Sequence, residues 1–198
     1  TELRREAFDR GNDHLMLFTK PGNMSIFSAF GFYPVMRTAD CLLMENRRGG
    51  LSAFLDGLTK PTDQKKPVGC IVANCNPFTL GHRYLVEQAA SQVDTLHLFV
   101  LSEDKSFFPA KDRMMLVQQG VADLKNVIVH PTGDYLISAA TFPTYFIKDK
   151  ERIPQIRCQL DLEVFANHFA PALGITRRFV GTEPLSPVTD AYNRQMMD

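Results

Sequence analysis

The sequence predicts an α/β fold in which helices cover both faces of a parallel sheet. From residue 68 onwards, short apolar runs alternate with segments whose apolar residues recur at helical spacing, and this alternation is typical of parallel sheets. The run at 95–101 is almost wholly apolar, as expected of a strand buried on both faces. Of the 198 residues, 44% are hydrophobic, which is enough to build a substantial core.

The first 47 residues predict part of a separate α/β unit. Leu3, Ala7 and Phe8 share one face of a helix that we expect to end at Gly11. The elements expected after it are a strand at 14–19, a turn at 21–23, a helix at 24–30, and strands at 32–35 and 41–44. This unit is therefore predicted to mix short strands with short helices.

Residues 48–67 separate this unit from the rest of the chain. Leu51, Phe54, Leu55 and Leu58 lie at helical spacing and indicate a short connecting helix. The polar stretch that follows carries two prolines and three lysines, which is typical of a linker. We therefore expect three segments: 1–47, 48–67 and 68–198.

The last segment predicts a series of strands and helices. We expect one strand to begin at Val68 and three more to lie at 95–101, 126–130 and 178–180. We expect one helix to follow Thr79 and three more to lie at 111–120, 160–169 and 190–197. Parallel sheets of this kind bind ligands at the carboxyl ends of their strands, so we expect the functional site there.

Composition and charge exclude several classes of function. The 22 basic and 22 acidic residues balance, and no basic stripe indicates nucleic-acid binding. No apolar run approaches the ~20 residues of a membrane span, and the charged first residues do not resemble a secretory leader. The four cysteines form no C-x-x-C pair, so we expect free thiols in a reduced, cytoplasmic protein. Both ends resemble cuts, so we expect a fragment of a longer chain.

The most informative stretch is 68–90, where a strand passes through a polar turn into a helix. At the junction lies Thr79-Leu80-Gly81-His82. A helix N-terminus exposes backbone N–H groups and carries a partial positive charge, so it attracts phosphate. Gly81 lets a ligand approach the backbone, and His82 could donate to a phosphate oxygen. The competing interpretation is that His82 only satisfies the helix start.

The Thr-x-Gly-His pattern, preceded by Asn76-Pro77-Phe78, resembles the signature loop of the nucleotidyltransferase superfamily. The resemblance implies a Rossmann-like sheet of that superfamily's HIGH type. It also implies attack of an acid or phosphate on the α-phosphate of a nucleoside triphosphate, with His82 and Thr79 as the catalytic residues. By the same resemblance the nucleotide-binding residues are Asn74, Asn76, Pro77, Phe78, Gly81, Gly181, Thr182 and Glu183.

Residues 12–44 resemble the C-terminal half of the GNAT acetyltransferase fold, through the pieces 18–23 and 30–35. The glycine-rich loop that binds the acetyl-CoA pyrophosphate in that family would precede residue 1. We therefore do not expect this segment to bind acetyl-CoA by itself. The competing interpretation is a packing or regulatory half-domain without activity of its own.

Three further segments, 107–113, 133–148 and 179–184, resemble the citrate lyase ligase family, in which a GNAT-like region precedes a nucleotidyltransferase domain. The resemblance implies an ATP-dependent acid–thiol ligase. In that family acetate attacks the α-phosphate of ATP, and the acetyl group then passes to the prosthetic-group thiol on the acyl-carrier subunit of citrate lyase. The implied cofactors are ATP and Mg²⁺, and the implied partners are acetate and the carrier subunit, with no nucleic acid and no membrane.

Several polar residues are weaker candidates. Glu183 is expected to contact the ribose or a metal, or else to be a solvated loop acid. Ser102, Arg113 and Lys148 are candidate phosphate or substrate contacts, although Arg113 could instead pair with an acid such as Glu103. Apart from that alternative for Glu183, no residue is predicted to bind a metal directly.

One departure from the superfamily pattern concerns its second signature, a Ser/Thr-rich segment that ends in an arginine and grips the triphosphate. The nearest match, 137–141, has no arginine and precedes the 178–180 strand, so we expect the true segment beyond Asp198. Two rival functions stay open. One is an adenylyltransferase for a phosphorylated cofactor precursor, which would need a basic cluster where only Arg83 is found. The other is a non-catalytic fragment that docks a carrier protein.

Overall fold

A computed structural model of the chain describes residues 2–61, 67–103, 107–136 and 142–181. Its α-helices are α1 (Glu2–Asp9), α2 (Met24–Ala29), α3 (Gly50–Asp56), α4 (Leu80–Ala90), α5 (Ala110–Gly120), α6 (Ile153–Val164) and α7 (Ala170–Leu173). Its strands are β1 (Met16–Thr19), β2 (Tyr33–Arg37), β3 (Leu42–Glu45), β4 (Val68–Ala73), β5 (Thr95–Val100), β6 (Val127–Pro131) and β7 (Arg177–Arg178). Two 3-10 helices, η1 (Pro21–Asn23) and η2 (Lys150–Arg152), and a π-helical turn, η3 (Phe165–Phe169), complete the described elements.

Four strands form a parallel sheet in the order β6-β5-β4-β7. The chain moves outwards from β4 through β5 to β6 and then returns to place β7 on the other side of β4. The strand order therefore reverses at β4, and the loop after β4 lies at the position where such sheets bind ligands. This arrangement confirms the predicted α/β fold with a parallel sheet.

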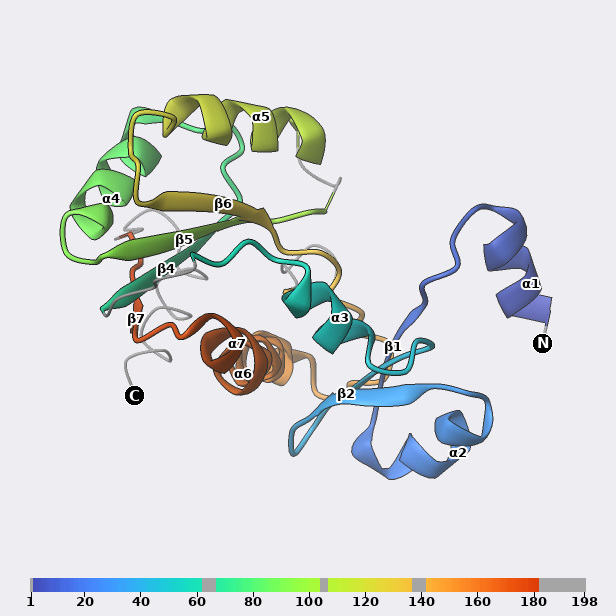
Figure 1. The fold of residues 1–198 in the computed structure, drawn as a ribbon. Helices are drawn as coiled ribbons and strands as arrows, with labels where there is room; N and C mark the ends of the chain where they lie inside the picture. The colour runs from blue at the N-terminus through green and yellow to red at the C-terminus, as the bar shows by residue number, and fades with distance from the viewer. Residues whose placement is uncertain (1, 62–66, 104–106, 137–141, 182–198) are drawn as a thin grey trace.

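Helices cover both faces of this sheet (Figure 1). Every residue of β5 is buried, as the apolar run predicted. Leu98 of β5 packs in one cluster with residues of α4 and α5, and Phe99 packs in the other cluster with residues of α3, α6 and α7. Successive side chains of a strand point to opposite faces, so the two clusters are the two sides of one sheet.

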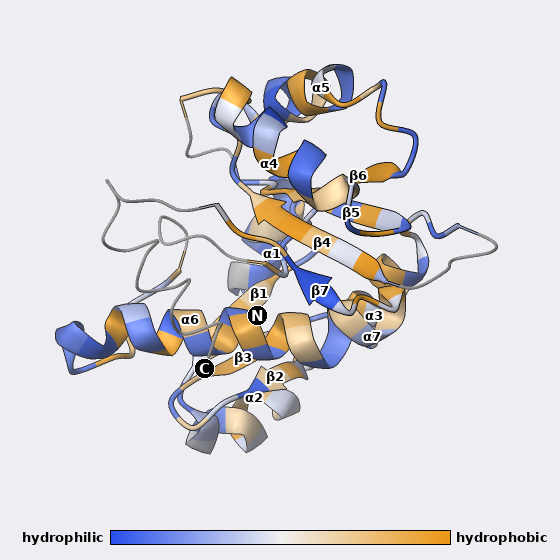
Figure 2. Ribbon diagram, turned by 90° about the vertical axis from the view of Figure 1, so that its left-hand side faces the viewer, coloured by the Kyte–Doolittle hydropathy of each residue, from blue (hydrophilic) through white to orange (hydrophobic). Residues whose placement is uncertain are grey.

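The N-terminal residues form a three-stranded antiparallel sheet in the order β1-β3-β2. All four residues of β3 are buried, and Leu43 belongs to the same apolar cluster as Phe99 of the parallel sheet and Ile156 of α6. The antiparallel sheet therefore packs against the helices below the parallel sheet. Figure 2 shows α6 between the two sheets, with apolar residues along its length, and β7 in the hydrophilic colour of its two arginines.

Most element positions agree with the sequence prediction, and α6 is the main difference. We expected a helix from residue 160, whereas α6 begins at Ile153. The Asp149 side chain accepts the backbone N–H of Glu151 in η2, and Pro154 lies in the first turn of α6, where a missing N–H is tolerated. These start signals were available in the sequence. The helix predicted at 190–197 lies outside the described residues.

Strand β7 also differs from its prediction, since it covers Arg177–Arg178 rather than 178–180. Within the described ranges, no helix has the length and apolar character needed to cross a bilayer.

Candidate functional site

The turn between β4 and α4 brings Thr79 and His82 together in a reciprocal cap. The backbone N–H of Thr79 donates to Nδ1 of His82 over 3.1 Å, and the backbone N–H of His82 approaches Oγ1 of Thr79 at 3.5 Å. Oγ1 of Thr79 also lies 2.8 Å from Nδ1 of His82. The side chain of each residue thus accepts from the backbone of the other at the start of α4.

This cap determines which nitrogen of His82 carries a proton. A backbone N–H can only donate, so Nδ1 must be the acceptor. The neutral imidazole then carries its proton on Nε2, which is a hydrogen-bond donor. Capping the helix and donating to a ligand are therefore compatible functions of one histidine side chain.

The backbone around the cap is open enough for a ligand. Leu80 and Gly81 occupy the first two positions of α4, where backbone N–H groups have no acceptor within the helix. A β-carbon added at Gly81 would meet only Oγ1 of Thr79 within 4 Å, at 3.7 Å, and Gly81 is exposed. These N–H groups and the positive end of the helix dipole form a donor set that suits an anion such as phosphate.

Phe78 supports the His82 ring from the side. The two ring centroids are 5.9 Å apart and the planes are inclined by 23°, so the rings are stacked. The Phe78 ring also lies directly against Gly120 at the end of α5, where a β-carbon would collide with it. Pro77, which precedes Phe78, is exposed and joined to Asn76 by a cis peptide bond.

The two asparagines of the loop are held by neighbouring loops. The guanidinium of Arg113 donates to both the carbonyl and the side-chain oxygen of Asn74, each over 2.7 Å. Oδ1 of Asn76 accepts the backbone N–H of Phe108 over 3.0 Å. Arg113, which the sequence makes a candidate phosphate contact or ion-pair partner, is fully buried and bonded to loop oxygens.

Ser102 lies just beyond β5 and joins the ends of two strands. Its Oγ accepts the backbone N–H of Gly133 over 3.0 Å, and its own backbone N–H donates to Oγ1 of Thr132 over 3.0 Å. Thr132 is fully buried directly after β6 and was not predicted as a site residue. Its position in the sequence could have indicated this role, since a threonine directly after an apolar strand can form a hydrogen bond with the neighbouring loop.

The remaining predicted residues lie at different distances from the loop. Gly181 follows β7, and a β-carbon there would approach Leu85 of α4 at 3.7 Å, so Gly181 is close to the helix. Lys148 is exposed on the segment before α6, and within the described residues no hydrogen bond or ion pair joins it to the loop. Thr182, Glu183 and the 137–141 segment lie outside the described residues.

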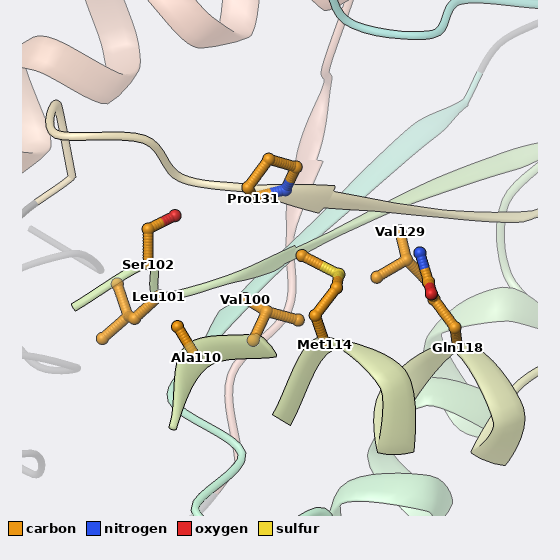
Figure 3. A pocket seen from close by; sticks show the side chains of 8 residues that line it. All are labelled: Val100, Leu101, Ser102, Ala110, Met114, Gln118, Val129 and Pro131. Carbon is orange, nitrogen blue, oxygen red and sulfur yellow. The ribbon is translucent and has the colours of Figure 1, made fainter. Parts of the chain in front are cut away.

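A cavity of about 320 Å³ lies between α5 and the ends of β5 and β6 (Figure 3). Most of its lining is apolar, and Ser102 and Gln118 contribute the polar side chains at its two ends. The cavity begins beside the carboxyl end of β5, one strand away from the Thr79–His82 cap.

The cysteines are free and buried, as predicted. Burial raises the pKa of Cys41, Cys70 and Cys75 to about 12 and that of Cys158 to about 11. Thiols with such pKa values are poor nucleophiles at neutral pH. Among the described residues, no group of three or more His, Cys, Asp or Glu side chains could hold a metal ion.

Comparison with known proteins gives consistent matches along the chain. The family model of the citrate lyase ligase C-terminal domain matches residues 68–198. The [citrate [pro-3S]-lyase] ligase of Klebsiella pneumoniae is 49% identical over 197 residues, which are 99% of this chain and 58% of that protein. The enzyme of the same name from Escherichia coli (strain K12) is 45% identical over 197 residues, covering 99% of this chain and 56% of its own length.

A more distant relative matches a shorter stretch. The phosphopantetheine adenylyltransferase of Staphylococcus carnosus (strain TM300) is 35% identical over 69 residues, which are 34% of this chain and 43% of that protein. The chain thus spans a little over half the length of the two ligases and about a third of it aligns with an adenylyltransferase.

Proposed function

The chain belongs to the citrate lyase ligase family, and on this premise we propose that it is the ATP-binding part of a ligase that activates citrate lyase. The proposed reaction has two steps. A carboxylate oxygen of acetate attacks the α-phosphorus of ATP, the bond to the bridging oxygen breaks, and acetyl-adenylate and pyrophosphate form. The prosthetic-group thiolate of the citrate lyase acyl-carrier subunit then attacks the acetyl carbonyl, and AMP leaves.

The Thr79–His82 cap is the observation that carries this proposal. Negative charge increases on the phosphoryl oxygens as the first step proceeds, and donors fixed in advance lower its barrier. His82 has Nδ1 engaged by the backbone of Thr79, so Nε2–H is the donor that we assign to the transferring phosphate. We assign the backbone N–H groups of Leu80 and Gly81 to the neighbouring phosphates. The hydroxyl of Thr79 lies 2.8 Å from Nδ1 of His82 and donates to it in this structure, and we propose that it turns from this nitrogen to a phosphate oxygen when the nucleotide binds.

The position of the loop supports ATP as the nucleotide substrate. The loop follows β4, where the strand order reverses, and Gly181 after β7 approaches α4 from the other side. The adenosine part of ATP would lie between these segments, with Gly181 near the ribose. Thr182 and Glu183, which lie outside the described residues, remain candidates for this part of the nucleotide from the sequence resemblance alone. Mg²⁺ usually reaches such sites on the phosphates of the nucleotide and neutralises part of their charge.

The contacts of Arg83 weigh against the rival adenylyltransferase. That reaction needs basic groups for a second, phosphorylated substrate, and Arg83 is the basic residue next to His82. Its guanidinium already donates to both carboxylate oxygens of Asp123, over 2.6 and 2.7 Å, and its Nε donates to Glu87 over 2.7 Å. An arginine neutralised by two carboxylates has little charge left for a phosphate ester. The local likeness to an adenylyltransferase is then a likeness in nucleotide binding.

The decisive experiment uses the full-length protein that contains this chain. It is incubated with ATP and labelled acetate in the presence of hydroxylamine, which traps acetyl-adenylate as acetyl hydroxamate. We expect hydroxamate and pyrophosphate in equal amounts, both lost in His82→Ala and both retained in His168→Ala, a histidine below the opposite face of the sheet. Adenylylation of a phosphate ester without acetate would support the rival enzyme, and unaltered carrier binding with no acetate chemistry would support the docking fragment.

A further inference from the structure

Arg113 of α5 is the largest fully buried side chain among the described residues, with no exposed surface. Its Nε donates to the carbonyl of Phe108 over 3.0 Å, and its Nη1 donates to both oxygens of Asn74 over 2.7 Å. Its Nη2 donates to the carbonyl of Glu103. One guanidinium therefore joins the loop after β4, which leads to Thr79 and His82, to the loop after β5.

Among the residues that the structure describes, these contacts leave the charge of Arg113 without a neutralising acid. A guanidinium stays protonated at any ordinary pH, and each acceptor here is an amide oxygen of the backbone or of Asn74. Within the described residues no carboxylate lies within ion-pair distance of Arg113. A buried positive charge therefore lies under the start of the loop, where low polarity strengthens its field.

The charge of Arg113 also acts on the buried thiol of Cys75 in this loop. Burial raises the pKa of Cys75, and the charge of Arg113 acts in the opposite direction. Cys75 itself has a left-handed backbone conformation, with φ 52°, which is uncommon for a residue with a β-carbon. Arg113 holds Asn74 immediately before this bend, so it fixes the backbone at the point where the loop turns towards α4.

We infer that Arg113 is a positioning residue for the proposed nucleotide site. It fixes the Asn74–Cys75 bend and places beneath the loop a positive charge that no carboxylate of the described residues neutralises, and this charge favours the triphosphate. The inference rests on the proposed function only in its choice of ATP as the anion. Arg113 does not touch the phosphates, because it is buried and four of its N–H donors are already used by protein oxygens.

The test compares the affinities of the full-length protein for ATP and for adenosine. Arg113→Lys keeps a charge but cannot reproduce the forked contacts, and Arg113→Met removes both. Asn74→Asp keeps the contact and neutralises the charge. The matched control is Arg83→Lys, which alters an arginine that joins α4 to Asp123 with its charge already neutralised.

We expect Asn74→Asp and both Arg113 variants to weaken ATP binding by about tenfold or more, while adenosine binding changes by about twofold at most. Arg83→Lys should leave the ATP-to-adenosine ratio unchanged. If Arg113 were needed only for folding, its substitution would lower the apparent affinities for ATP and adenosine together. After correction for the folded fraction, neither affinity would change. Thermal unfolding of each variant identifies that fraction.

Asn74→Asp keeps the test valid even if Arg113→Met fails to fold. In Asn74→Asp, Arg113 gains a buried ion pair, so we expect this variant to fold. Wild-type ATP affinity in folded Asn74→Asp and Arg113→Lys would overturn the inference. The binding assay needs no acetate, so its result is independent of the ligase reaction. The wild-type protein could form no acetyl-adenylate while these variants still lower its affinity for ATP relative to adenosine. That result would contradict the proposed function and support the inference.

Discussion

The backbone nitrogen of Thr79 lies 3.1 Å from Nδ1 of His82, so the residue that caps helix α4 also sets the tautomer of the histidine beside it. The bond comes from the main chain of Thr79, whereas the helix cap comes from its hydroxyl oxygen. Substitution of the Thr79 side chain can therefore remove the cap while the proton on His82 stays on Nε2.

Thr79→Val should lower the free energy of unfolding by about 1 kcal/mol, which is the usual cost of losing an N-cap side chain. Because we assign the hydroxyl to the outer phosphates, the same variant should weaken ATP binding more than AMP binding. Urea unfolding and titration with the two nucleotides measure these effects. Thr79→Ser retains the hydroxyl and should resemble wild type, and equal losses for ATP and AMP would contradict the assignment.

Gly120 offers a test of the support for His82 from outside the loop. A β-carbon at Gly120 would collide with the Phe78 ring, which stacks on His82, so Gly120→Ala should displace both rings. We expect ATP affinity to fall several-fold, with a modest loss of thermal stability from overpacking. Gly57→Ala, at the end of α3, is the matched control, since its nearest neighbour would lie at 3.4 Å. Unchanged ATP affinity in Gly120→Ala would show that the stacking is dispensable.

The junction between the two sheets depends on a buried carboxylate. Glu45 of β3 is 3% exposed, and its Oε2 accepts the phenolic hydroxyl of Tyr135 over 2.8 Å while its Oε1 accepts the backbone N–H of Leu51 over 3.0 Å. Burial and the bond to Glu45 raise the pKa of Tyr135 well above its ordinary value, so the hydroxyl remains a donor.

Tyr135→Phe should therefore cost about 1.5–3 kcal/mol of unfolding free energy, the typical contribution of a hydrogen bond to a charged group. Denaturant unfolding at neutral pH measures the loss. Tyr84→Phe removes a hydroxyl from a tyrosine that is 64% exposed and should stay within about 0.5 kcal/mol of wild type. A similar small effect at both positions would mean that His14, whose Nε2 lies 2.9 Å from the same oxygen of Glu45, satisfies this carboxylate without Tyr135.

The sequence predicted the parallel sheet well because its signals are local. Strand β5 is a nearly continuous apolar run, and the Thr79-x-Gly81-His82 junction marks the start of α4. The first half of α6 was missed although Ile153, Ile156 and Leu160 already recur at helical spacing. Its position between two sheets gives the helix more than one face to bury, and that position depends on contacts distant in sequence.

The role of Arg113 could not be read from the sequence for a similar reason. An arginine near strand ends can contact phosphate, pair with an acid or bond backbone carbonyls, and the choice depends on which loops surround it. Asn74 is 39 residues away along the chain, and only the parallel pairing of β4 with β5 brings the two loops together. Sequence patterns thus proposed candidate residues for the site, whereas the tertiary structure determined which of them face each other.

A pair of buried histidines should make the folded protein sensitive to acid. Nδ1 of His97 lies 2.9 Å from Nε2 of His130 inside the parallel sheet, where the two side chains are almost completely buried. Burial, with a smaller effect of Lys60, lowers the pKa of His97 to about 4. Burial and the neighbouring His97 lower the pKa of His130 to about 4.

The unfolded chain binds a proton at each histidine below about pH 6.5, whereas the folded chain does so only near pH 4. Stability should therefore be level above pH 6.5 and fall between pH 6.5 and 4, with a slope approaching about 1.4 kcal/mol per pH unit for each histidine. Urea unfolding across this range measures the slope. Replacing both His97 and His130 by leucine should flatten it, since no titrating group then remains at that point of the core, while His168→Gln should leave it as in wild type. An unaltered slope in the double variant would show that other groups cause the acid sensitivity.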